Sequence, residues 1–168
     1  KAPEKAKAKE NYKGALKESV QKFPNEFYAI TWQKNFAEQL EEDGNKEGAK
    51  AEFEKAKKMA MKWINDPAFL KKNAPPEMSD LTLPELWSQV GEIEDKLGNE
   101  AAKKTAQENA VKETLKLKPS VKTPTHVIYL VAYMKPVREL SEIEPWLIKL
   151  QTAYPEEFTY YQRHAKLL

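Results

Sequence analysis

The sequence contains no cysteine and no long apolar run, and both absences limit what the protein can be. Without cysteine the chain has no disulfide, no thiol nucleophile and no thiolate metal site. Its longest apolar run, residues 127–134, is much shorter than the roughly 18 residues that a membrane-spanning helix needs. We therefore expect no membrane insertion. The lack of cysteine fits the cytoplasm and the bacterial periplasm equally well.

Histidine and arginine are also scarce, which argues against catalysis and against nucleic-acid binding. The two histidines, His126 and His164, have no obvious carboxylate or nucleophile partner in the sequence. No zinc-protease, EF-hand, P-loop or dinucleotide-binding motif occurs. The two arginines, Arg138 and Arg163, lie outside the lysine-rich stretch 112–122, whose lysines suit the carboxyl end of a helix. The chain is thus predicted to be no enzyme, with no cofactor, no metal and no nucleic-acid partner.

Charged residues are plentiful and balanced in sign. The 28 basic and 26 acidic residues give a net charge of +2 and are interspersed, as on a solvated helical surface. With 32% charged and 40% hydrophobic residues over 168 positions, the composition favours a soluble protein with one core. Residues 1–9 have almost no apolar content and are expected to be a disordered or tether segment. Residues 10–168 are predicted to form a single helical domain.

Helix signals recur along the chain, whereas strand signals are nearly absent. Thr123-Pro124 is typical of a helix start, and Gly44-Asn45 and Gly98-Asn99 are typical of turns. The predicted fold class is all-α, with helices near residues 11–23, 27–42, 46–63, 84–97, 100–117, 124–134, 142–153 and 156–168. Prolines at positions 67, 75 and 76 interrupt this series, so an insert at 66–83 is expected to hold one short helix near 68–72.

One helical motif occurs twice, 34 residues apart. The first copy reads Val127-x-x-Leu130-Val131-x-x-Met134, and the second reads Tyr161-x-x-His164-Ala165-x-x-Leu168. The clearest full unit reads Phe36-Ala37-x-x-Leu40, then Ala49-x-x-x-Phe53-x-x-Ala56. Small residues at these positions let two antiparallel helices approach closely, while the large ones fill the space beside them.

These motifs resemble tetratricopeptide (TPR) repeats in a divergent form. The unit around Gly91 keeps Ala110 but has Lys103 and Gln107 where the second helix of a TPR has small or aromatic residues. The resemblance implies a right-handed superhelix, or α-solenoid, of antiparallel helix pairs. It also implies that the last helix lacks its partner, so the chain is expected to be a fragment of a longer protein. The alternative is a non-repeat helical bundle, because periodic Ala, Leu and Phe occur in any bundle.

The resemblance further implies a concave groove lined by the first helix of each pair. Its predicted residues are Thr31, Lys34, Glu38, Glu41, Glu85, Ser88, Glu92, Asp95, Ile128 and Gln162, with Thr125, Ala132, Lys135, Thr159 and Lys166 beside the last two. The first half of this groove is acidic, so the expected partner is a protein or peptide that is basic or amphipathic. The alternative is that these residues are only solvated helix faces.

The functional hypothesis is therefore a non-catalytic scaffold that binds a protein or peptide in this groove. The alternative is an accessory helical domain of a larger enzyme, or of a transport or secretion protein, whose active module lies outside this chain. The tryptophans test the architecture separately. Trp87 and Trp146 fall on apolar stripes and are predicted to be buried, whereas Trp32 and Trp63 are predicted to be half-exposed. Trp32 is expected to pack beneath the insert or, if exposed, to anchor a partner.

Overall fold

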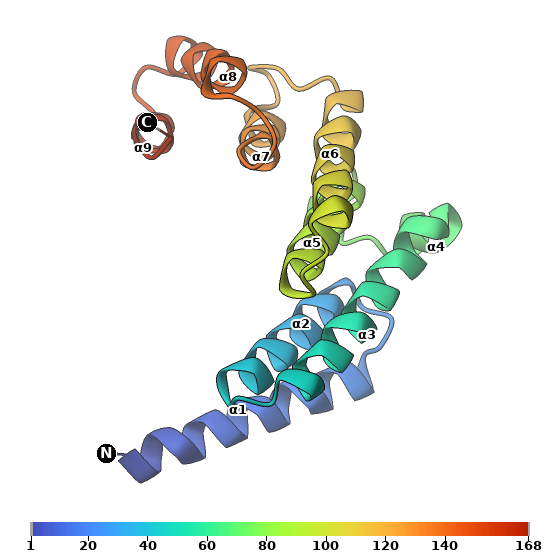
Figure 1. Ribbon diagram of the computed structural model, residues 1–168. Helices are drawn as coiled ribbons and strands as arrows, with labels where there is room; N and C mark the ends of the chain where they lie inside the picture. Colours follow the sequence, from blue (N-terminus) through green and yellow to red (C-terminus); the bar gives the residue numbers. More distant parts are fainter. Residues whose placement is uncertain (1, 168) are drawn as a thin grey trace.

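Helices make up most of residues 2–167, the part of the chain that the computed structural model describes (Figure 1). In chain order they are α1 (Ala2–Lys22), α2 (Phe27–Glu42), α3 (Lys46–Asn65), α4 (Pro67–Asn73), the 3₁₀ turn η1 (Pro76–Met78), α5 (Thr82–Lys96), α6 (Glu100–Lys116), α7 (Pro124–Met134), α8 (Leu140–Ala153) and α9 (Phe158–Ala165). The described residues contain no strand, which confirms the all-α class. None of the described helices has the length and apolar character needed to cross a membrane.

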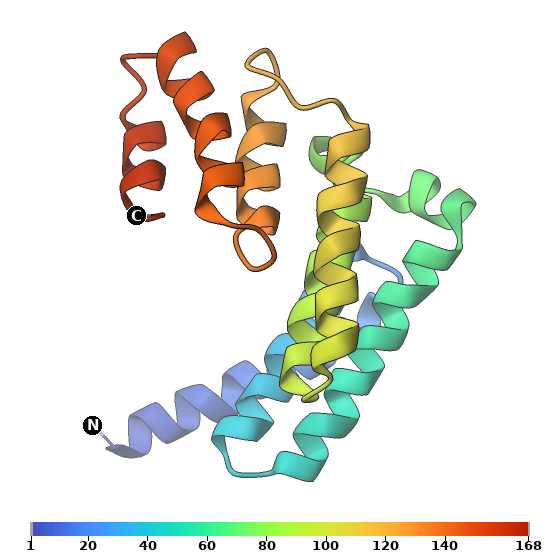
Figure 2. The same cartoon turned by 45° about the horizontal axis from the view of Figure 1, so that its top comes forward.

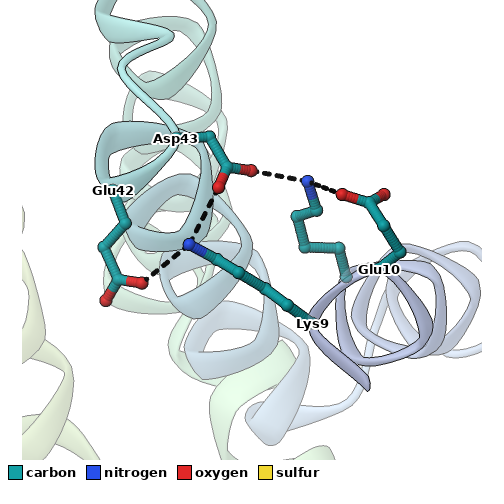
Figure 3. A network of polar contacts seen from close by, with 5 residues as sticks. Lys9, Glu10, Glu42 and Asp43 are labelled. Carbon is teal, nitrogen blue, oxygen red and sulfur yellow. Dashed lines mark hydrogen bonds and ion pairs between the residues drawn. The ribbon is translucent and has the colours of Figure 1, made fainter. Parts of the chain in front are cut away.

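Helix α1 begins earlier than the sequence predicts. Residues 2–9, expected to be disordered or a tether, are its first turns, and Lys1 lies outside the described residues. Ala, Lys and Glu favour helix strongly, and ion pairs to the end of α2 fix this helix in place. The Lys9 ammonium lies 3.2 Å from a Glu42 oxygen and 2.8 Å from an Asp43 oxygen (Figure 3). Hydrogen bonds from Lys13 and Lys9 hold the pKa of Asp43 below its ordinary value, so this carboxylate stays ionised.

The α2–α3 hairpin packs through small residues, as the motif spacing predicts. Ala37 on α2 and Ala56 on α3 are fully buried, and Phe53 is buried in the same cluster. Alanines at the crossing allow the two backbones to come close, and the phenylalanine fills the adjoining space. Ile93 of α5 belongs to this cluster too, so the first hairpin packs directly onto the next.

Gly91 has the corresponding place in the α5–α6 hairpin. A Cβ atom built on Gly91 would lie 3.1 Å from the Cγ of Gln107 and 3.6 Å from the carbonyl oxygen of Lys103. The two residues that depart from the TPR pattern therefore still lie at the helix crossing. A Cβ here would require only the flexible Gln107 side chain to shift, whereas a larger side chain would meet the backbone of α6, so the crossing needs a small residue at this position.

The insert at 66–83 covers Trp63. The predicted short helix near 68–72 is confirmed as α4. Trp63 is buried and packs edge-on against Phe27 and Phe69, with ring centroids 5.9 Å and 5.0 Å away. The prediction that Trp63 is half-exposed is wrong, because α4 brings Phe69 over it. Trp32 is half-buried as predicted, but it contacts Phe23 at the α1–α2 corner rather than the insert.

Helices α7, α8 and α9 share a separate core with part of α6. Leu130, Leu147 and Leu150 are fully buried in it. Trp87 and Trp146, predicted to be buried, keep partial exposure at the margin of this core, because each lies beside its helix's buried stripe rather than on it. On α9, Tyr161 and Ala165 are exposed, as expected for a helix without a partner on that side, and the predicted role of Leu168 lies outside the described residues.

The helices pack mainly against their neighbours along the chain: α1 with α2, α2 with α3, α3 with α5, and each later helix with the next. The path that results is open and curved, with the two ends apart and α7–α9 not folded back over α1–α3 (Figures 1 and 2). Helix α2 lies on the inside of this curve relative to α3, and α7 and α9 lie on the same, inner side of α8 (Figure 1). We call the surface formed by α2, α5, α7 and α9 the inner surface. Whether residues 10–168 act as one domain stays a prediction.

Candidate functional site

The predicted groove residues of α2 and α5 lie against each other on the inner surface. Lys34 of α2 donates a hydrogen bond to the Glu92 carboxylate of α5. Two turns further along α2 and one turn further along α5, Lys96 donates to Glu41 at 2.7 Å. This hydrogen bond raises the pKa of Lys96, which remains protonated. These two pairs join residues that lie 58 and 55 positions apart in the chain. Together their side chains form one continuous strip, which we call the α2–α5 strip.

The acidic character predicted for this strip is largely compensated within the protein. Besides Glu41 and Glu92, Asp95 also accepts a hydrogen bond, at 2.7 Å from Lys103 of α6. Glu38 makes no hydrogen bond or ion pair with a described side chain and is half-buried. Thr31, at the other end of α2, is half-buried as well. The strip therefore presents mostly paired charges, with Glu38 at its centre acting on Lys96 through its charge alone, without a hydrogen bond.

Between α5 and α7 the inner surface is joined by a buried tyrosine. Tyr133 of α7 donates a hydrogen bond of 2.8 Å to the Glu85 carboxylate of α5. Burial, and next the charge of Glu85, raise the pKa of Tyr133 above its ordinary value of 10.0, so the phenol keeps the proton that it donates. This contact fixes α7 beside α5, although the two helices are separated by the whole of α6.

A hollow next to this tyrosine contains two of the predicted groove residues. This α5–α7 hollow has a volume of about 150 Å³ and is lined by Ser88, Glu92, Gln107, Ala110, Ala132, Tyr133 and Pro136. Ser88 and Glu92 were predicted as groove residues of α5, and Ala132 was predicted beside Ile128 on α7. The volume is below the roughly 300–1,000 Å³ of typical small-molecule pockets and suits a single side chain.

A second concavity lies between α7 and α9. This α7–α9 cleft has a volume of about 180 Å³. We call Ile128, Val131, Ala132 and Leu167 its apolar floor, and its remaining lining residues are the cations Lys135, Arg163 and Lys166. Of the predicted groove residues Ile128 and Gln162, Ile128 lines this cleft, whereas Gln162 is exposed on α9 and does not line it. Ala132 lines both concavities, so they adjoin each other along α7.

Both histidines contact a carboxylate, so the expectation that they have no such partner is wrong. His126 Nε2 lies 3.0 Å from Asp80, and His164 Nε2 lies 2.9 Å from Glu144. These contacts join α7 to the segment before α5, and α9 to α8, so each histidine links two elements. Among the described residues no three His, Asp or Glu side chains are grouped to hold a metal ion.

No protein-family model, no curated protein and no solved structure matches the chain. The candidate surface is therefore defined by this chain's own geometry.

Sequence reasoning missed Arg163 and the contact between Tyr133 and Glu85. Arg163 lies one position from Gln162, and a small error in the rotation of α9 moves one into the cleft and the other out of it. Tyr133 belongs to the apolar run of α7 and reads as an ordinary core residue. Its polar contact depends on how far α7 is rotated against α5, which no local pattern encodes.

Proposed function

We propose that this chain is a non-catalytic scaffold of TPR-like repeats that binds a protein or peptide segment along its inner surface. In this proposal the hairpins α2–α3, α5–α6 and α7–α8 are successive units of a right-handed superhelix, and α9 is the first helix of a further unit. Packing between chain neighbours, an open curved path, and Ala37, Ala56 and Gly91 at the crossings support this arrangement.

One observation carries the functional part of the proposal: the α5–α7 hollow and the α7–α9 cleft adjoin each other at Ala132. Two concavities of side-chain size in a row suit an extended segment that places successive side chains into them. A single deep pocket for a small molecule would instead be larger and more enclosed. Residues of the α5–α6 hairpin, of α7 and of α9 line these two concavities, so the concavities exist only when these elements are stacked.

The ion pairs already present on the α2–α5 strip limit how much a charged partner can gain there. Glu41, Glu92 and Asp95 are paired with lysines, so a basic partner gains most from Glu38. Paired rim charges set orientation and association rate more than affinity. A basic or amphipathic partner at this end of the surface stays a prediction.

Selection from a random peptide library tests the proposal, with the purified chain as bait. Ser88→Trp fills the α5–α7 hollow, and Ala102→Trp places the same side chain on an exposed position of α6 as a matched control. We expect Ser88→Trp to weaken selected peptides by about tenfold or more and Ala102→Trp to leave them unchanged. Circular dichroism checks that both variants are folded. Peptides that bind both variants equally well, or a selection that yields no binder, would count against the inner surface as the site.

A further inference from the structure

The α7–α9 cleft differs in charge from the cavity beside α6. Three cations, Lys135, Arg163 and Lys166, line it, and its lining includes no carboxylate. The cavity beside α6 shows the usual pattern instead, because Lys103, Lys104 and Arg138 there alternate with Glu100, Glu139 and Glu142. The cleft is thus a concentrated positive site on a chain whose charges otherwise balance.

None of these three cations is paired with a carboxylate among the described residues. Lys135, Arg163 and Lys166 are exposed, and none forms an ion pair with a described carboxylate. Lysines elsewhere on the inner surface differ, since Lys34 and Lys96 each bind a glutamate of the neighbouring helix. Like charges held around one cleft repel each other, and an anion bound between them removes that repulsion.

We propose that the α7–α9 cleft binds an acidic segment of a partner protein, with one apolar side chain on the apolar floor and carboxylates beside Lys135, Arg163 and Lys166. The inference rests on the proposed function and names the partner chemistry for one end of the inner surface. The volume of about 180 Å³ fits one large side chain and is too small for most cofactors. A peptide is favoured over single-stranded nucleic acid because the apolar floor is aliphatic and offers no aromatic ring for base stacking.

The probe is a fluorescein-labelled peptide with one central leucine flanked on both sides by Asp and Glu, acetylated and amidated so that it carries no terminal charge. Binding is followed by fluorescence anisotropy at low and at physiological salt. We expect saturable binding that weakens as salt rises, because exposed ion pairs are screened. Replacing the leucine by serine is expected to weaken binding several-fold, since the apolar floor then loses its contact.

Charge reversal on the protein tests the three cations. Arg163→Glu with Lys166→Glu is expected to weaken the acidic peptide by about tenfold or more. The matched control, Lys71→Glu with Lys72→Glu, makes the same change in net charge on exposed positions of α4 and is expected to alter affinity about twofold at most. Lys135→Glu, on a different helix, is expected to weaken binding too, so the test does not depend on α9 tolerating two substitutions.

Several outcomes would overturn the inference. Equal losses in the cleft variants and in the α4 control would show attraction by net charge alone. If replacing the leucine by serine does not change the affinity of the peptide, the cleft is a general anion site. If an oligothymidylate binds as tightly as the peptide and loses affinity in the same charge-reversal variants, the cleft is a nucleic-acid surface. If the acidic peptide fails while library peptides sensitive to Ser88→Trp bind, the inference falls and the proposed function stands. If neither binds, both fall.

Discussion

The substitution Ala37→Leu tests whether close helix approach holds the first hairpin together. Ala37 is fully buried, and so are Ala56 and Ile93 in the same cluster. If space were available, three more buried carbons would stabilise the fold by about 2 kcal/mol. No such space exists beside a fully buried alanine at a helix crossing, so we expect overpacking to win and the free energy of unfolding to fall by about 1–3 kcal/mol.

Urea unfolding followed by circular dichroism measures this change, with the slope of the transition checked for constancy. Ala51→Leu is the matched control, because Ala51 is exposed on α3 and the same side chain meets only solvent there. Its expected effect is within about 0.5 kcal/mol of zero. A stability for Ala37→Leu equal to or above that of the parent chain would show that the helices do not cross closely at this point, and the repeat-like packing would be refuted.

Three further predictions concern the second hairpin, the pH response and the overall shape. Gly91→Ala gains up to about 1 kcal/mol in helix propensity, while its Cβ meets the flexible Gln107 side chain at 3.1 Å. Urea unfolding should therefore show Gly91→Ala to be as stable as the parent or slightly more stable. Gly91→Leu should be less stable than the parent. Arg138 donates to both oxygens of Glu108 and lowers its pKa below the ordinary 4.5. That stabilisation is therefore full above the ordinary pKa and is lost as pH falls through the folded value, so an acid series of melting temperatures should fall more steeply for the parent than for Arg138→Gln. A compact chain of 168 residues would have a radius of gyration of about 15 Å; X-ray scattering should give a clearly larger value, and a value near 15 Å would exclude the open path.

Much of the fold follows from local sequence signals. The all-α class, the short helix in the insert and the alanines at the α2–α3 crossing depend on propensity, proline positions and spacing within one or two helices. The helix at residues 2–9 was not predicted, for a different reason. Low apolar content suggested a tether, but Lys9 and Lys13 have partners at the far end of α2, which a reading of the segment alone does not include.

The candidate site was less predictable because it depends on how each hairpin is rotated against the next. Side chains of α2 and α5 meet on one surface, yet the lysines that neutralise the carboxylates there were not foreseen as their partners. Lys103, for example, pairs with Asp95 across a turn between helices. Likewise, His164 and Glu144 meet only because α9 packs on α8. The pairing of charges on this surface depends on contacts between different helices. The sequence pattern of a single helix does not predict such contacts.

Mapping the bound state of a library-selected peptide by NMR tests the central claim most directly. Amide and methyl chemical shifts of the labelled chain would be followed during titration with the peptide. Binding along the inner surface predicts that the largest changes fall on Ser88, Glu92, Ile128 and Ala132, which line the two adjoining concavities. Changes concentrated on α3 and α8, with these four residues unmoved, would contradict it.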